Sequence, residues 1–170
     1  MLWIPNYYGG VPASLDQFVG AWYPLNRLLF ALFADAFTAH HISITIAVAM
    51  GLIGSYLFGR AQGWLVSSSL SLACMYFLAT TYGWLQIGTT AAHSFAILPF
   101  MLLALHLASR GRYGGGIALG SIALAVGFLA GFMQIVFYDY VVAGLYALFL
   151  DWNTYSRARP FLHNFKISYT

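Results

Sequence analysis

The sequence predicts an all-α protein, a polytopic bundle of helices that crosses a membrane. Of its 170 residues, 61% are hydrophobic and 6% are charged, whereas soluble domains carry about 25% charged residues. The chain has four acidic residues, too few to cover a water-facing surface of normal size. Apolar runs of about 20 residues with at most one charge, the length of a helix that crosses the hydrocarbon core, recur from residue 38 onward.

These runs predict five transmembrane helices in a single membrane domain, 1–170. The expected spans are 38–58, 64–82, 92–108, 114–132 and 134–150, with a loop or a broken helix over 83–91. The last two spans are separated because one helix over 114–150 would be about 55 Å long at about 1.5 Å per residue, nearly twice the thickness of the hydrocarbon core. A turn near residues 131–134 fits better.

The cationic residues favour one orientation of the spans. The seven lysine and arginine residues are too few and too scattered for a nucleic-acid-binding surface, so we expect no nucleic-acid partner. All but one follow the first, third or fifth span: Arg60, Arg110, Arg112, Arg157, Arg159 and Lys166. By the positive-inside rule this side is cytoplasmic. We therefore expect residues 1–37 outside the cytoplasm, and 151–170 as a cytoplasmic tail that is loose after residue 155.

Residues 1–37 hold two kinds of segment. The first is a loop rich in proline, glycine, tryptophan and tyrosine, from Leu2 to Asn26. The second, residues 24–36, is apolar but too short to cross a membrane, and with Pro24 at its start it fits an interfacial helix.

Asp139 is the sharpest candidate for chemistry within the spans. An intramembrane carboxylate costs about 2.5 to 3.5 kcal/mol on insertion scales, and it usually faces a cavity or a partner. The hydroxyl groups of Tyr138 and Tyr140 are its expected hydrogen-bond donors, and Gln134 lies at the same end of the span. A purely structural role, with Asp139 reaching water or a local partner near the interface, stays open.

Histidines open the first and third spans at the same predicted depth. His40, His41 and His93 lie there, whereas His106 is about 20 Å further along its helix and cannot share a ligand with His93. Two imidazoles at matching depth are what a haem or a chlorophyll-type pigment needs, but a histidine at a helix end also sits stably among lipid headgroups. No cofactor is assigned. The single cysteine, Cys74, excludes a zinc pattern of cysteines, and no metal site is predicted.

Glycines recur along the fourth predicted span. They stand at positions 114, 115, 116, 120, 127 and 131. Small residues at such spacings let neighbouring helices approach closely. No Lys-Ser or Lys-Thr follows them, which excludes a phosphate-binding P-loop, so helix packing is the expected role.

Three segments carry a resemblance to a known family. The first comprises Leu2-Trp3, Pro5, Gly9-Gly10, Pro12, Asp16 and Tyr23-Pro24-Leu25-Asn26; the second, Ala92-His93, Pro99 and Leu102–Leu105; the third, Ala130-Gly131, Gln134-Ile135, Tyr138 and Gly144-Leu145-Tyr146. Together they resemble the YfhO-like bacterial membrane proteins of the GT-C glycosyltransferase superfamily. These members are longer, so we expect the chain to correspond to part of one, in the bacterial cytoplasmic membrane.

The resemblance implies an enzyme that takes a sugar from a polyprenyl-phosphate carrier in an outward-facing cavity. In a reaction of this type a carboxylate deprotonates the acceptor hydroxyl. The expected catalytic residues are Asp16, which matches a family position, and Asp139, the carboxylate within the spans. The implied substrate-binding residues are Gly9, Gly10, Tyr23, Asn26, Arg27, His93 and Gln134.

A second function stays open beside the enzymatic one. The acidic motif that precedes the loop in the family is not present in this sequence, and Phe132 and Met133 replace the family's histidine before Pro-Gln. Under this alternative, the chain is a non-catalytic accessory or scaffold subunit of a larger membrane complex, and it contacts lipids, pigments or other membrane protein subunits.

Overall fold

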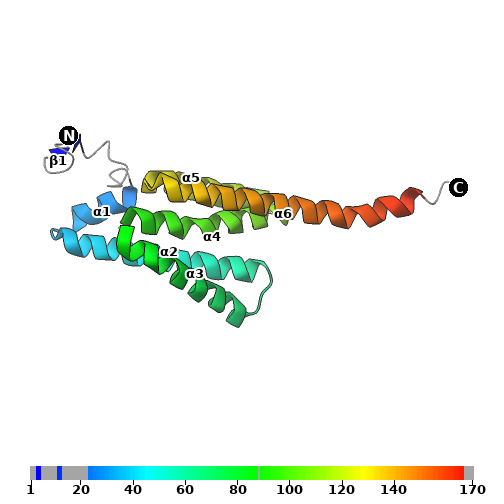
Figure 1. The fold of residues 1–170 in the computed structure, drawn as a ribbon, viewed down its shortest axis with the longest axis horizontal. Helices are drawn as coiled ribbons and strands as arrows, with labels where there is room; N and C mark the ends of the chain where they lie inside the picture. Colours follow the sequence, from blue (N-terminus) through cyan, green and yellow to red (C-terminus); the bar gives the residue numbers. More distant parts are fainter. Residues whose placement is uncertain (1–2, 5–10, 13–22, 88, 167–170) are drawn as a thin grey trace.

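In the computed structural model, helices that lie side by side form a membrane-type bundle (Figure 1). The structure describes the backbone of residues 3–4, 11–12, 23–87 and 89–166, and the side chains of 23–35, 37–79 and 91–152. The prediction of an all-α helical membrane bundle is confirmed. Gly9, Gly10 and Asp16 lie outside the described residues.

The described part of the chain contains six helices. They are α1 (Pro24–Leu32), α2 (Ala36–Ala61), α3 (Val66–Ile87), α4 (Thr89–Ser109), α5 (Tyr113–Ala130) and α6 (Met133–Lys166). Within the described residues, α2, α4, α5 and the Met133–Trp152 part of α6 are each long and apolar enough to cross a membrane, and α3 holds a shorter apolar stretch, Val66–Ala79. The chain is therefore built as an integral membrane protein.

The N-terminal segment contains two short, paired strands. The strands β1 (Trp3–Ile4) and β2 (Val11–Pro12) are antiparallel, with Trp3 opposite Pro12 and Ile4 opposite Val11. The sequence predicted only a loop in this region.

Local sequence explains where the helices begin and turn. Pro24 occupies the first turn of α1, where its missing N–H is not needed. Asp35 caps α2, because its carboxylate accepts hydrogen bonds from the backbone N–H groups of Phe37 (3.2 Å) and Thr38 (2.9 Å). Gly131 ends α5 with a φ of 92°, a left-handed conformation that favours glycine, and the chain turns there into α6. The predicted turn at 131–134 thus has a structural basis.

Four helices, α2, α3, α4 and α6, are longer than the predicted segments. α3 continues to Ile87 and α4 begins at Thr89, inside the stretch where a loop or a broken helix was expected. α6 continues as a helix to Lys166, so the expectation of a loose tail after residue 155 was wrong. Neither glycine nor proline interrupts the sequence from Asp151 to Arg159, and Pro160 lies within the helix that continues to Lys166. In Figure 1 this part of α6, orange to red, runs beyond the other helices.

The bundle has two ends, which we call the α1 end and the arginine end. The α1 end holds α1 together with the first residues of α2, α4 and α6. The arginine end holds the α2–α3 and α4–α5 connections, with Arg60, Arg110 and Arg112 on or beside them. Buried polar side chains gather at both ends of the bundle.

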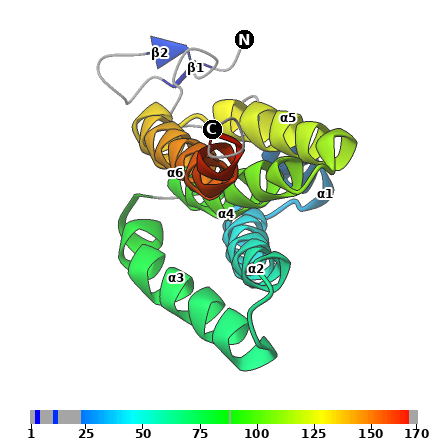
Figure 2. The same cartoon turned by 90° about the vertical axis from the view of Figure 1, so that its right-hand side faces the viewer.

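α4 is the central helix of the bundle. Of its membrane-crossing stretch, 61% is buried inside the protein, compared with 22% to 33% for the stretches in α2, α5 and α6. It packs against α2, α3, α5 and α6, and Figure 2 shows these helices around it. Alanines such as Ala92 and Ala96 are fully buried in this core.

Glycines allow the closest helix contacts. At Gly116, a β-carbon would stand 2.8 Å from the carbonyl oxygen of Ala104, so α5 approaches the backbone of α4 directly. Gly127 also faces α4, through Ile97, whereas Gly114 and Gly115 face open space. The predicted packing role therefore holds for part of the glycine series.

Candidate functional site

Buried polar side chains from three helices meet at the α1 end. They are Tyr23 and Asn26 at the start of α1, Ser43 on α2 and His93 on α4. Each is 4% exposed or less, although the surroundings are apolar. We call these four residues the α1-end polar cluster. A buried polar group is costly unless it is hydrogen-bonded, so the bonds within the cluster decide what it can do.

A chain of hydrogen bonds runs through the cluster. The hydroxyl of Ser43 donates to Oδ1 of Asn26 at 2.6 Å. The oxygen of the same hydroxyl lies 2.8 Å from Nε2 of His93. Because a serine hydroxyl has one proton, and that proton goes to Asn26, Nε2 of His93 is the donor in the second bond. The network therefore fixes the tautomer of His93.

This tautomer leaves the other ring nitrogen of His93 as an acceptor. Nδ1 carries a lone pair, it is buried, and it has no hydrogen-bond partner among the described residues. His93 as a whole is 1% exposed. A buried acceptor of this kind is positioned to receive a hydrogen bond from a hydroxyl, an ammonium group or a water molecule.

Tyr23 covers one side of the His93 ring. The two ring centroids are 4.3 Å apart, with 45° between the ring planes. Burial raises the pKa of Tyr23 to about 12, so its hydroxyl stays neutral at physiological pH. The cluster thus contains neutral hydrogen-bonding groups held by aromatic packing.

Asp139 lies on α6 and is 5% exposed. It interacts electrostatically with Tyr76 of α3, whose hydroxyl donates to the backbone carbonyl of Phe95. Phe95 is only two positions beyond His93 on α4. A buried carboxylate is therefore brought to the same end of α4 as the α1-end polar cluster.

The remaining predicted residues of this region lie elsewhere on the surface. Gln134 is exposed, and its amide donates to the hydroxyl of Tyr138 at 3.1 Å, one turn further along α6. Tyr138 and Tyr140 are themselves exposed, at 53% and 40%. Arg27 is exposed on α1 and has interactions of its own. The structure thus brings Tyr23, Asn26 and His93 together and leaves Gln134 outside the cluster.

The histidines that open α2 lie against each other and against Phe37. The ring of His40 contacts that of His41, with centroids 6.0 Å apart, and His41 in turn contacts Phe37. Nε2 of His93 is occupied by Ser43. Among the described residues, no group of three or more His, Cys, Asp or Glu side chains lies close enough to hold a metal ion.

Sequence reasoning missed Ser43 and Tyr76. Ser43 stands between Ile42 and Ile44 in an apolar span, and that contrast was the signal available for it. Nothing local distinguished Tyr76 from the other tyrosines, because its role depends on contacts with α4 and α6 that arise only in the fold.

A second polar cluster, also missed, joins α2, α4 and α6 at the arginine end. The side-chain amide of Gln62 donates to the hydroxyl of Tyr146 at 2.6 Å. His106 lies 3.3 Å from that hydroxyl through Nδ1 and 3.0 Å from the carbonyl oxygen of Ala61 through Nε2. Both ring nitrogens of His106 have partners, unlike those of His93. We read this cluster as a structural link between helices.

Comparison of the chain with protein-family models, with curated proteins and with solved structures gives no match.

Proposed function

We propose that the α1 end binds the polar head of a lipid-linked sugar, and that the chain contributes to transfer of that sugar, as the resemblance to YfhO-like GT-C proteins implies. One observation carries the proposal. Tyr23 and Asn26 come from the first segment of the resemblance and His93 comes from the second, and these residues contact one another directly or through Ser43. Segments far apart in the sequence thus meet in one buried polar cluster.

The chemistry of this cluster suits an incoming hydroxyl group. In sugar transfer from a polyprenyl phosphate, the acceptor oxygen forms a bond to the anomeric carbon, and the bond from that carbon to the phosphate oxygen breaks. The acceptor proton goes to a carboxylate, and the electron pair leaves with the phosphate. Asp139 is the proposed proton acceptor, and Nδ1 of His93 is the proposed hydrogen-bond acceptor that orients a sugar hydroxyl. Asp16 stays a prediction for the second carboxylate.

Burial supports a functional role for these groups. A carboxylate and an unpartnered imidazole nitrogen within a membrane-spanning bundle are both costly, and such groups mark ligand or proton pathways by default. His106 shows that the same fold can satisfy both nitrogens of a buried histidine. Among the described residues, Nδ1 of the buried His93 has no such partner.

The test is sugar transfer by the purified protein in lipid vesicles. The assay supplies polyprenyl-phosphate-linked glucose or mannose and follows release of polyprenyl phosphate. We expect Asp139→Asn to abolish release while the protein stays inserted and folded. Asp151→Asn is the matched control, because Asp151 is an exposed carboxylate on the same helix near the arginine end. Full activity of Asp139→Asn would refute the catalytic role.

A non-catalytic subunit is the second candidate, and the course of α3 favours it. α3 packs against α2 and α4 on one side, and Figure 2 shows it diverging from α6. Leu70, Met75 and Leu78 along it are each at least half exposed. We expect a partner helix to cover this face if the chain is a subunit. Purification from native membranes in mild detergent tests it: a partner at fixed stoichiometry supports this function, and a solitary chain counts against it.

A further inference from the structure

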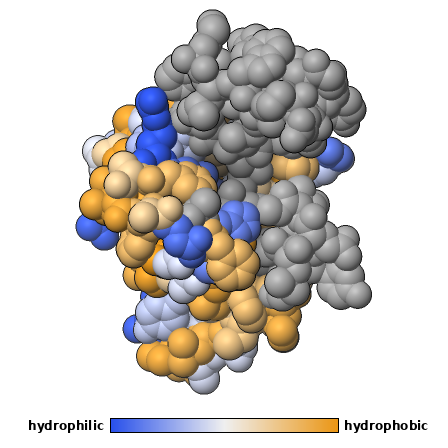
Figure 3. All heavy atoms as spheres, turned by 90° about the vertical axis from the view of Figure 1, so that its left-hand side faces the viewer, coloured by the Kyte–Doolittle hydropathy of each residue, from blue (hydrophilic) through white to orange (hydrophobic). Residues whose placement is uncertain are grey.

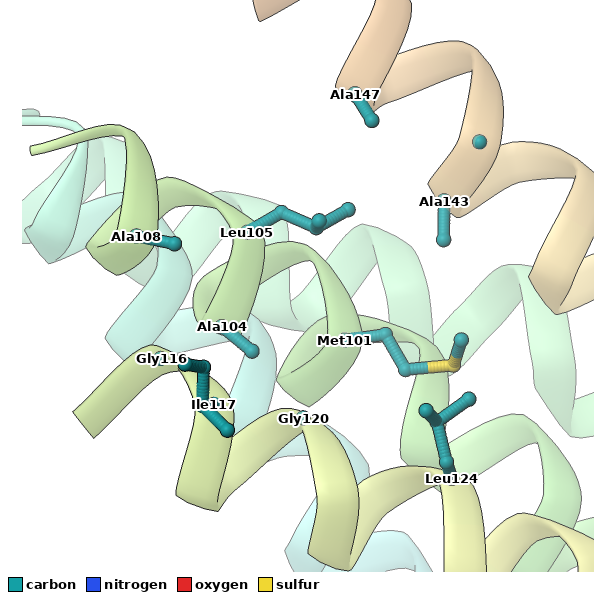
Figure 4. A pocket seen from close by; sticks show the side chains of 11 residues that line it. Met101, Ala104, Leu105, Ala108, Gly116, Ile117, Gly120, Leu124, Ala143 and Ala147 are labelled. Carbon is teal, nitrogen blue, oxygen red and sulfur yellow. The ribbon is translucent and has the colours of Figure 1, made fainter. Parts of the chain in front are cut away.

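A groove opens between α4, α5 and α6 toward the arginine end. It encloses about 350 Å³. Figure 4 shows Met101 and Leu105 of α4, with residues of α5 on one wall and small residues of α6 on the other. The lining residues are apolar throughout. The groove is separate from the α1-end polar cluster, which lies at the opposite end of the bundle.

Two features of the sequence create this space. α5 and α6 each pack on α4 but have little contact with each other. Several of the residues that face the gap are small: a β-carbon at Gly144 would meet no atom within 4 Å, and one at Gly120 would meet only the β-carbon of Ala104, at 3.5 Å. Water in this groove would find no polar partner, so in a membrane the groove is filled by hydrocarbon.

The groove ends beside two cations. Ala108 and Gly116 line it, and Arg110 and Arg112 lie on the connection between these two residues. Both arginines are exposed. Arg110 also interacts electrostatically with Tyr146 of α6, which is adjacent to the lining residue Ala147. Positive charge therefore stands at the end of an apolar groove.

The dimensions fit one leaflet of a bilayer. From Met101 to Ala108 the groove follows α4 for roughly 10 Å, given a rise of about 1.5 Å per residue. Half of a hydrocarbon core is about 15 Å thick. A lipid whose headgroup lies level with Arg110 thus has its acyl chain at the depth of the groove.

We propose that this groove binds one anionic phospholipid, with its phosphate beside Arg110 and Arg112 and an acyl chain along Met101, Leu105 and Gly144. Arginine recognises phosphate oxygens through paired N–H donors. The apolar walls take the acyl chain without any change in the protein.

Charge argues against a second copy of the chain as the occupant. The described residues of the arginine end include Arg60, Arg110 and Arg112, against the single carboxylate of Asp151. Packing of a second copy in the same orientation would bring like charges together at this end. An anionic lipid neutralises them instead.

The experiment is native mass spectrometry of the full chain released from nanodiscs that contain phosphatidylglycerol and phosphatidylcholine. We expect the protein to retain phosphatidylglycerol in preference. The double variant Arg110→Gln, Arg112→Gln should bind phosphatidylglycerol roughly thirtyfold more weakly, with phosphatidylcholine unaffected, since each arginine near an anionic lipid surface contributes about a fivefold gain in affinity. Gly144→Leu, which fills the groove, should reduce retention of both lipids.

Two control variants should behave as the unsubstituted protein does. Arg60→Gln removes a cation at the same end whose guanidinium instead donates to the carbonyl oxygen of Trp64. Gly114→Leu adds the same side chain at a glycine of α5 that faces open space away from the groove. Loss of phosphatidylglycerol in either control would overturn the assignment to this groove.

A measurement on the unsubstituted protein keeps the proposal testable if a variant fails to fold. Phosphatidylglycerol with a photoreactive acyl chain should crosslink to the Met101–Leu105 segment. Equal retention of the two lipids, crosslinks confined to α3, or a dimer that Gly144→Leu dissociates would each overturn the proposal.

Discussion

At the scale of single residues, the two buried histidines differ in one respect that decides their roles. His106 has partners on both ring nitrogens, whereas His93 has a partner only on Nε2. Ser43 is the partner of Nε2, and its proton is committed to Asn26. The tautomer of His93 therefore depends on a serine from another helix.

Removal of the Ser43 hydroxyl should destabilise the protein. Ser43→Ala leaves Nε2 of His93 and Oδ1 of Asn26 buried without this partner, at an expected cost of about 1 to 3 kcal/mol in the free energy of unfolding. Thr45→Val is the control, because the hydroxyl of Thr45 is exposed and bonds only to the carbonyl of His41 in its own helix. We expect that change to stay within about 0.5 kcal/mol. Reversible unfolding in mixed micelles measures both, and equal stability of Ser43→Ala would contradict the hydrogen-bond chain.

The cap of α2 should titrate at unusually low pH. Hydrogen bonds from the side chain and the backbone of Thr38, and from the backbone of Phe37, hold the pKa of Asp35 below its ordinary value. Because the folded-state pKa is lowered, the ionised cap stabilises the protein at pH values above the unfolded-state pKa. This stabilisation is lost as the pH falls through the folded-state pKa. Thr38→Val removes the side-chain hydrogen bond and should raise the pKa of Asp35. Carbon-detected NMR of the carboxyl group measures it; an unchanged pKa in Thr38→Val would contradict the assigned cause.

At the scale of the helices, close approach is concentrated on α4. Gly116→Ala should therefore destabilise the protein by about 1 to 3 kcal/mol, because the new β-carbon would stand 2.8 Å from a backbone oxygen of α4 and the helices must separate. Gly115→Ala meets no atom within 4 Å and should be neutral or slightly stabilising through its better helix propensity. Thermal unfolding in detergent compares the two. A loss of stability that is equal in both variants would contradict the assigned contact between Gly116 and α4, because helix propensity alone favours alanine at both positions.

The helices were more predictable than the contacts between them. Apolar runs and the distribution of charge follow from local sequence, so the spans could be located before the structure was known. The ends of α3 and α6 were harder to predict, because hydropathy marks where a membrane core ends and not where a helix does. The contact between Tyr23 and His93 joins positions far apart in the sequence, and only the packing of α1 and α2 on α4 determines it.

At the scale of the whole molecule, the division into a polar α1 end and an arginine end leads to a prediction about sidedness. The arginine end should face the cytoplasm, because cationic connections are retained there. In a Cys74→Ser background, a cysteine introduced at Leu32 should react with a membrane-impermeant maleimide in intact cells. One introduced at Gly111 should react only after permeabilisation. Labelling of both positions from outside would contradict the orientation, and with it the proposed site for an extracytoplasmic sugar carrier.

The length of α6 has a consequence for electrostatics beyond the bilayer. Past Trp152, where the apolar stretch ends, the helix continues to Lys166, a rise of roughly 20 Å. Figure 1 shows it leaving the bundle along the long axis. Counterions screen charge over about 8 Å at physiological ionic strength. The backbone at Lys166 therefore lies more than two screening lengths along the helix axis from Trp152, beyond the main reach of charge at the bilayer surface.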